Sequence, residues 1–231
     1  LTVIPMFLLM GSIAFASGIS TRLYAASHTL LGNVRGGLAM ATIMACAGFA
    51  AICGSTSATA AAMGKVALPE MKKYGYADTL ATGSVASAGS LGILIPPSTI
   101  FIVYGILTQQ SIGSLFLAGI FPGILLTILF IIVVVVLCKR NPALAPAGQA
   151  TTFKQKIVGL SGITEMLLLF ILVMGGLFAG WFSPVQAGAV GAAGALLIGL
   201  VRRNLSWKAF KDALIETVKV TCEIMIIVTG A

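Results

Sequence analysis

Four long stretches of the chain carry no charged side chain, and they set the expected secondary structure. They span residues 1–21, 36–64, 79–138 and 166–201. A helix needs about 20 apolar residues to cross a lipid bilayer. The last two stretches are therefore each long enough for more than one crossing, and we expect an all-α polytopic membrane protein.

Turn residues and charges divide these stretches into individual helices. We expect transmembrane crossings at residues 1–20, 77–109, 115–138, 163–179 and 185–201, and a further apolar segment from residue 220. A polar, basic loop with Arg22, His28 and Arg35 should follow the first crossing. Residues 205–219 place apolar and charged side chains on opposite sides of a helix, which predicts an amphipathic helix on the membrane surface.

The segment at residues 36–71 does not fit a simple crossing. Gly54, Ser55, Thr56 and Ser57 split its apolar part near the middle, and each half is too short to span comfortably. Two half-length helices joined by small polar residues predict a re-entrant hairpin, which returns to the face it entered. With such a hairpin, every loop that carries Lys or Arg falls on one face of the membrane, and the positive-inside rule makes that face cytoplasmic.

A second interruption lies inside the crossing at residues 77–109. The sequence GSLGILIPPST, residues 89–99, places two adjacent prolines and two glycines in an uncharged helix. Non-helical backbone at membrane depth is tolerated where protein surrounds it or where it lines a water-filled cavity. Broken segments of this kind mark binding sites in transporters. We therefore expect the hairpin turn and this break to meet and to form a site.

Both interruptions are rich in hydroxyl groups and contain no Asp, Glu, His, Lys or Arg. A proton relay needs titratable groups, and divalent cations usually recruit carboxylates. Carbonyl and hydroxyl oxygens suit a monovalent hard cation, so we expect a sodium site. The competing interpretation is that these Ser and Thr side chains only bond to their own helix backbone and that the small residues serve only packing.

Composition agrees with a membrane protein. Of the 231 residues, 58% are hydrophobic and 9% are charged, whereas a soluble domain is about 25% charged. We attribute the net charge of +8 to loop topology rather than to nucleic-acid binding. The four cysteines lie in apolar stretches without metal-ligand spacing, so neither a disulfide nor a metal centre is expected.

The isolated ionisable residues are expected to have ordinary structural roles. His28 is expected to be solvated or interfacial, and Lys65 to extend from the second hairpin arm toward the surface. Glu165 is expected to open a helix, where an acid interacts favourably with the helix dipole. Glu223 lies nearer the apolar interior, and its position fits either a functional role or a place at the cytoplasmic edge.

Three stretches resemble the large membrane subunit of the tripartite ATP-independent periplasmic (TRAP) transporters, which carry C4-dicarboxylates, sialic acid and related organic acids. They begin at Gly54 (GSTSATAAAMGKVALPEMKKYGY), Ser84 (SVASAGSLGILIPPSTIFIVYG) and Gly176 (GLFAGWFSPVQAGAVGAAGALLIGL). The likeness runs over most of the chain. It includes the order and spacing of the hairpin turn and the Pro-Pro break.

The resemblance implies an inverted-repeat, elevator-type transporter, in which each repeat has one re-entrant hairpin and one discontinuous helix. It implies a sodium-coupled symporter in the bacterial inner membrane. Its expected partners are a small four-helix membrane subunit and a periplasmic substrate-binding protein that delivers the organic acid. It also implies that the chain begins within the protein, holds the first half of the site and the start of the second repeat, and does not transport alone.

On this basis the chain divides into five segments. They are a transmembrane helix with a cytoplasmic loop (1–35), the re-entrant hairpin of the transport domain (36–71), its discontinuous transmembrane helix (72–110), a transmembrane helix with a cytoplasmic linker (111–160), and scaffold helices with an amphipathic arm and the start of the second repeat (161–231).

The resemblance also assigns residues to the site. The sodium ion would be held by the hairpin turn and the facing loop, namely Gly54, Ser55, Thr56, Ser57, Gly89, Ser90, Gly92 and the carbonyls around Ile95. The substrate would lie near Ser57, Thr59, Ser98 and Thr99.

Two other classes of protein compete with a secondary active carrier. Re-entrant hairpins also occur in passive channels, but channels usually repeat a charged or carbonyl filter by oligomer symmetry. An intramembrane enzyme would need a nucleophile with a base, or metal ligands, at membrane depth. The single His is expected in a loop, so we favour the carrier, keep the channel or pore component as the alternative, and expect no enzymatic activity.

Overall fold

The computed structural model describes residues 2–146 and 161–230, and all regular structure within these ranges is helical. Residues 147–160 of the expected cytoplasmic linker lie outside the described residues. In chain order the elements are α1 (Val3–Ala16), α2 (Ile19–Leu31), α3 (Gly37–Cys53), α4 (Thr56–Lys73), α5 (Asp78–Gly89), the 3-10 turn η1 (Ser90–Ile93), α6 (Thr99–Thr108), α7 (Ile112–Arg140), η2 (Pro142–Leu144), α9 (Ser161–Phe170), the π-helical turn η3 (Ile171–Gly175), α10 (Gly176–Phe178), α11 (Pro184–Val201) and α12 (Trp207–Gly230).

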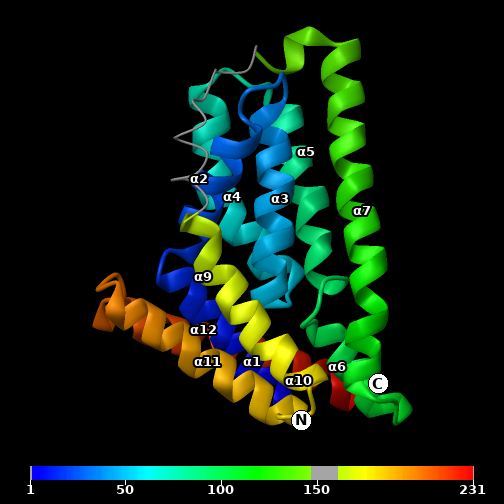
Figure 1. Ribbon diagram of the computed structural model, residues 1–231, viewed down its shortest axis with the longest axis vertical. Coiled ribbons are helices and arrows are strands. Elements are labelled where there is room, and N and C mark those ends of the chain that lie inside the picture. Colours follow the sequence, from blue (N-terminus) through cyan, green and yellow to red (C-terminus); the bar gives the residue numbers. More distant parts are fainter. Residues whose placement is uncertain (1, 147–160, 231) are drawn as a thin grey trace.

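The helices form two groups in Figure 1. The helices α3, α4, α5 and α7 run along the long axis of the molecule, and α1, α11 and α12 cross it near the lower end. Within the described ranges, α7 and α11 are each long and apolar enough to cross a membrane, and α1 with α2 passes the same test as a pair bent by 65°. The architecture is that of a helical membrane protein.

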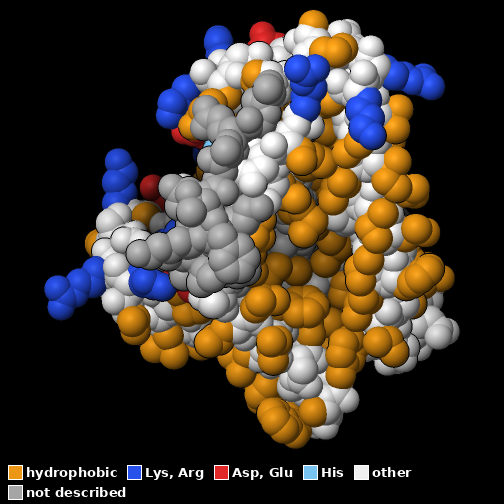
Figure 2. Space-filling model, turned by 45° about the horizontal axis from the view of Figure 1, so that its top comes forward, with side chains coloured by type: hydrophobic (Ala, Val, Ile, Leu, Met, Phe, Trp, Pro, Cys, Tyr) orange, Lys and Arg blue, Asp and Glu red, His pale blue; other side chains and the backbone are white. Residues whose placement is uncertain are grey.

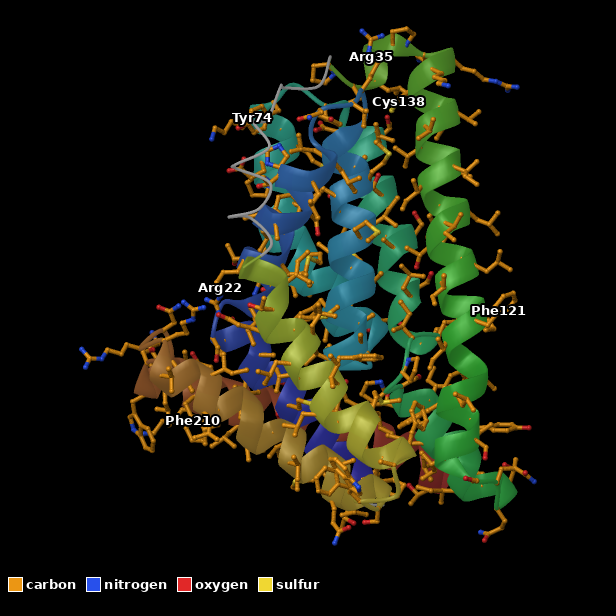
Figure 3. All side chains as sticks on the ribbon, viewed as in Figure 1. Arg22, Arg35, Tyr74, Phe121, Cys138 and Phe210 are labelled. Carbon is orange, nitrogen blue, oxygen red and sulfur yellow. The ribbon has the colours of Figure 1, made fainter. Side chains whose placement is uncertain are left out.

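The outward side of α7 is an extended apolar exposed surface. Its large exposed side chains are Leu117, Phe121, Ile124, Leu125, Ile128, Leu129, Ile132, Val133, Val136 and Leu137. Phe121 points away from the helix bundle in Figure 3. Figure 2 shows hydrophobic side chains over most of the lower visible surface, with Lys and Arg at its upper and left edges. A side of this composition suits contact with lipid chains.

The expected basic loop after the first crossing is wrong, because most of that segment is the helix α2. Ile19, Leu23 and Tyr24 are buried and lie on one face, so the segment has the apolar stripe of an amphipathic helix. Gly18, with a φ of 75°, makes the bend that separates α2 from α1. As a result Arg22 and Arg35 do not share a loop, and Figure 3 shows Arg35 near the upper end and Arg22 well below it.

The segment at residues 36–71 forms two helices that pack on each other, as expected. All residues of α3 are buried except Met44 and Ala47, and α3 is surrounded by α2, α4, α5 and α7. The turn between α3 and α4 lies partway along the height that α7 spans (Figure 1). Gly54 ends α3 with a φ of 61°, and the Ser55 side chain accepts a hydrogen bond from the Ala58 N–H at the start of α4. The helix–turn–helix prediction is confirmed, and the return to one membrane face stays a prediction.

The predicted interruption of the next helix is also confirmed. The helix α5 ends at Gly89, η1 follows, and α6 begins only at Thr99. Pro96 and Pro97, joined by a cis peptide bond, offer no backbone donors to a helix at this point.

The amphipathic segment and the following apolar segment form one helix, α12, and the expected division near residue 220 is wrong. No glycine or proline lies between Trp207 and Thr229, so nothing in the sequence breaks the helix. Ala213 and Thr217 are buried on the face of α12 that packs against α1.

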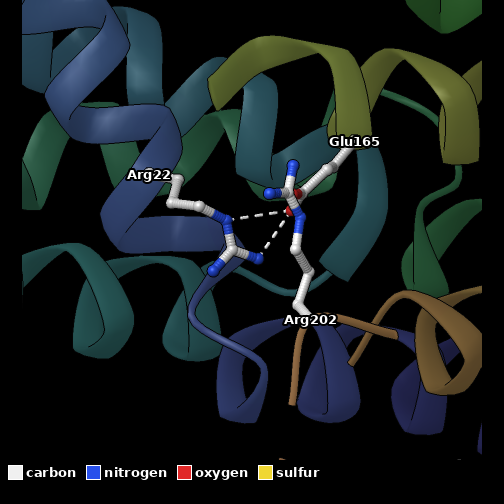
Figure 4. A network of polar contacts seen from close by, with 3 residues as sticks. All are labelled: Arg22, Glu165 and Arg202. Atoms are coloured by element: carbon white, nitrogen blue, oxygen red, sulfur yellow. Dashed lines mark hydrogen bonds and ion pairs between the residues drawn. The ribbon is translucent and has the colours of Figure 1, made fainter. Parts of the chain in front are cut away.

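A buried carboxylate connects three helices, and the expected role of Glu165 at a helix start is wrong. Glu165 lies on α9 beyond the first turn and is only 7% exposed. Its Oε2 accepts hydrogen bonds from Arg22 Nε at 3.0 Å and Nη2 at 2.6 Å. Arg202 Nε lies 2.8 Å from Oε1, so both guanidinium groups surround one acid (Figure 4). The cluster ties α2 and the end of α11 to α9.

Candidate functional site

The turn of the hairpin is joined to the break in the following helix. The carbonyl oxygen of Gly54 accepts hydrogen bonds from the Thr99 N–H at 3.1 Å and the Thr99 hydroxyl at 2.9 Å. A Cβ on Gly92 would lie 2.7 Å from the carbonyl carbon and oxygen of Ser55. Such an approach of two backbones needs glycine. The expected meeting of the two interruptions is confirmed, while the ligand roles of their residues stay predictions.

Two helix N-termini are brought together by this contact. The helix α4 begins at Thr56 and α6 begins at Thr99, and both residues line a cavity of about 550 Å³. The first backbone N–H groups of a helix have no partner within it, and the helix dipole makes this end positive. Two such ends beside one cavity favour a negatively charged group there.

The cavity has a second wall of different chemistry. The turn and the break contribute Ser55, Thr56, Ser57, Ile93 and Thr99, whereas α1 contributes Leu8 and Ser12 and α12 contributes Glu216 and Glu223. No Lys, Arg or His is among the residues that line it. Another cavity, of about 290 Å³ between α5 and α7, has no charged lining residue and none from the turn, so we take the first as the candidate site.

Some of the expected site hydroxyls are already bonded within the chain. The Ser98 hydroxyl is buried and donates to the Ile93 carbonyl at 2.8 Å. The Ser90 hydroxyl donates to the Ser87 carbonyl at 2.6 Å. Neither residue lines the candidate site. For Ser90 and Ser98, the geometry matches the interpretation in which a hydroxyl bonds to nearby backbone.

Other hydroxyls remain available to a ligand. The Thr56 hydroxyl oxygen is buried and has no hydrogen-bond partner in the described part of the chain. Ser57 is exposed in the cavity, and no hydrogen bond of its hydroxyl is found there. Thr59 is fully buried beside Cys53 and does not line the cavity. Of the four expected substrate residues, the structure therefore places Ser57 and Thr99 at the cavity, and Thr59 and Ser98 away from it.

The expected sodium ligands divide in the same way. Ser55, Thr56 and Ser57 line the cavity. The glycines of the set do not line it, and they serve close packing: Gly89 lies against Ala60. Ile95 packs on Gly123 of α7.

The Gly54 carbonyl is a poor candidate for an ion ligand. It already accepts two hydrogen bonds, and a carbonyl oxygen has two lone pairs. The side-chain oxygens left for a monovalent cation at the turn are those of Ser55, Thr56 and Ser57, together with main-chain carbonyls of the break. This donor set fits a hard monovalent cation. In the described residues no group of His, Cys, Asp and Glu has the arrangement of a metal site.

Sequence reasoning missed Glu216 as a lining residue. It lies on α12, which the sequence divided into two segments, so Glu216 and Glu223 were not seen as two turns apart on one helical face. A neighbouring cavity of about 400 Å³ shares Glu216 and is also lined by Lys65 and Asp212. The Lys65 ammonium lies 5.6 Å from the centroid of the Phe15 ring and makes no ion pair with either acid.

The whole chain, residues 1–231, matches the family described as tripartite ATP-independent periplasmic transporter, DctM component. It is 36% identical to the C4-dicarboxylate TRAP transporter large permease protein DctM of Pseudomonas aeruginosa, over 100% of the chain and 54% of that protein. It is 34% identical to the sialic acid TRAP transporter large permease protein SiaM of Vibrio cholerae, over 100% of the chain and 54% of that protein. It is 35% identical to the isethionate TRAP transporter permease protein DctMQ of Oleidesulfovibrio alaskensis, over 99% of the chain and 36% of that protein. The chain spans about half the length of the first two.

Proposed function

Because the chain belongs to the DctM family of tripartite ATP-independent periplasmic transporters, we propose that it is part of the large permease subunit of a sodium-coupled symporter that imports an organic acid. The similar proteins are named for the transport of C4-dicarboxylates, sialic acid and isethionate. A small organic acid is accordingly the proposed class of substrate.

One observation carries the proposal more than any other. The turn of the α3–α4 hairpin is hydrogen-bonded to the break before α6, and both face one cavity. The N-termini of α4 and α6 would attract the carboxylate of the substrate. The hydroxyls of Thr56 and Ser57 would face the sodium ion, whose charge offsets that of the substrate carboxylate. Coupling arises because each ion binds more tightly when the other is present.

The remaining features of the transport cycle are part of the same proposal. The hairpin and the broken helix would form a transport domain that slides against a scaffold, as in an elevator. The permease would lie in the bacterial inner membrane with its basic loops in the cytoplasm. It would work with a small four-helix membrane subunit and a periplasmic binding protein that delivers the substrate.

Uptake into proteoliposomes tests the proposal. The full-length permease subunit and its small partner are reconstituted together, and labelled organic acids are supplied with the cognate binding protein. We expect uptake only when the binding protein and an inward sodium gradient are both present. Uptake that ignores the sodium gradient would refute the coupling, and passive equilibration without accumulation would favour a channel.

A further inference from the structure

The two walls of the candidate site have opposite electrostatic character. The wall formed by the turn and the break presents the N-termini of α4 and α6, which favour a carboxylate. The wall formed by α12 presents the carboxylates of Glu216 and Glu223. A ligand that fills the cavity therefore meets a positive region at one end and a negative region at the other.

Glu223 is the acid of this wall that borders only the candidate site, and Lys219, one turn before it on α12, does not line that cavity. Glu216 also borders the neighbouring cavity, which contains Lys65. Glu223 makes no ion pair within the described part of the chain, and no basic side chain lines its cavity. Glu165 shows the contrast, because two arginines surround that buried carboxylate. An acid that faces a binding cavity without a partner is available to a cationic group of the ligand.

This charge pattern discriminates between two kinds of organic acid. A dicarboxylate bound with one end at the helix N-termini would direct its other carboxylate toward the α12 wall, where like charges repel. A molecule with a carboxylate at one end and a protonated nitrogen at the other would find a favourable partner at each wall. The cavity, at about 550 Å³, is large enough for a small molecule of this type.

We propose that Glu223 is a specificity-determining residue and that the substrate is a zwitterion, with its carboxylate at the N-termini of α4 and α6 and its cationic nitrogen at Glu223. The inference rests on the proposed function, since it names the substrate class of the same site. It departs from the expectation that sodium alone balances the charge of the substrate.

A matched pair of probes tests this inference directly. Succinate and 4-aminobutyrate both have four-carbon chains and differ at one end, where a carboxylate replaces an aminomethyl group. The full-length permease subunit with its small partner is purified, and binding of each probe in sodium chloride is measured by calorimetry and by protection against thermal unfolding. We expect 4-aminobutyrate to bind at least tenfold more tightly than succinate.

Two variants assign that preference to a residue. Glu223→Gln should abolish it, because the amide keeps the shape of the side chain and removes the charge. Glu70→Gln is the matched control, since Glu70 is on α4, lies near Lys73 and does not line the cavity. The control should keep the preference of the unmodified protein.

Several outcomes would overturn the inference. Succinate that binds as tightly as 4-aminobutyrate, a preference that survives in Glu223→Gln, or no binding of either probe would each do so. Sodium chloride alone could also protect the protein against thermal unfolding. If that protection were lost in Glu223→Gln, the carboxylate would bind the coupling ion, and the zwitterion inference would be overturned. Sodium-driven uptake of the physiological substrate is measured separately, so the proposed function can hold when the zwitterion inference fails.

Discussion

The carbonyl oxygen of Gly54 accepts two hydrogen bonds from the single residue Thr99, one from its N–H and one from its hydroxyl. The two residues are 45 positions apart, and their contact joins the hairpin to the broken helix. The backbone bond does not depend on the side chain, whereas the second bond does. The contribution of the hydroxyl can therefore be tested without removing the contact entirely.

Thr99→Val keeps the shape of the side chain and removes its donor. We expect the free energy of unfolding to fall by about 1 kcal/mol, the usual net value of one buried hydrogen bond. Sodium-driven uptake should fall as well, because the turn is held less firmly. Thr99→Ser keeps the hydroxyl and should behave nearly as the unmodified protein. Equal stability of Thr99→Val and the unmodified protein in thermal unfolding would contradict this prediction.

Gly92→Ala should separate the turn from the break. The added Cβ would lie 2.7 Å from the carbonyl group of Ser55 and 2.9 Å from the backbone nitrogen of Thr56, and backbone atoms have no rotamer with which to move aside. We expect sodium-driven uptake, normalised to the protein in the vesicles, to fall by at least about tenfold.

Gly83→Ala provides the matched control for this variant. Gly83 lies on α5, and no atom comes within 4 Å of a Cβ built there. Alanine in a helix is favoured over glycine by roughly 0.5–1 kcal/mol, so this variant should be at least as stable as the unmodified protein. If both glycine variants transport normally, the close contact at Gly92 has no role in uptake.

Ser57→Ala and Ser98→Ala should have different effects, although both remove one hydroxyl. Ser57 faces the cavity, so its loss should raise the sodium concentration for half-maximal uptake several-fold and leave thermal unfolding unchanged. The Ser98 hydroxyl bonds to the Ile93 carbonyl, so its loss should lower the unfolding temperature and leave the sodium dependence unchanged. Sodium titrations and unfolding curves of both variants show whether each hydroxyl acts on ion binding or on stability. An unchanged sodium dependence in Ser57→Ala would mean that Ser57 is not a ligand of the ion.

Glu165→Gln should be among the most destabilising single changes in the helices α9 to α12. It removes the charge that Arg22 and Arg202 share, and breaking a buried pair in this way costs about 3 kcal/mol. Arg202→Gln should cost less than about 1 kcal/mol, because its side chain is 53% exposed. The unfolding midpoint of Glu165→Gln should therefore lie below that of Arg202→Gln. A lower midpoint for Arg202→Gln would contradict this prediction.

Local sequence features were sufficient to predict the hairpin and the broken helix. Gly54 and the prolines Pro96 and Pro97 act within a few residues of their own position, by allowing a positive φ or by removing donors. The long uncharged run that contains α7 likewise predicts that helix from neighbouring residues alone. The meeting of the turn with the break was expected from their shared chemistry, and the bonds between Gly54 and Thr99 agree with it.

The features that were missed depend on partners far away in the chain. Arg22 and His28 suggested a loop, but Ile19, Leu23 and Tyr24 find a buried surface on other helices and make the segment helical. The role of Glu165 depends on arginines from α2 and from the end of α11, and no local pattern indicates that meeting. Ser90 and Ser98 were expected at the site because hydroxyl content alone does not show which carbonyl each hydroxyl reaches.

The uninterrupted course of α12 gives the cavity wall a regular spacing of charge. Glu216 and Glu223 are seven residues apart, which corresponds to about 10 Å along a helix axis. Asp212 precedes them by one further turn on the same side and borders the neighbouring cavity. If the joined turn and break were to slide along α12 by that distance, as in the proposed elevator motion, one carboxylate would take the place of the other beside the cavity. The ligand would then keep the same kind of counter-charge at both ends of its path.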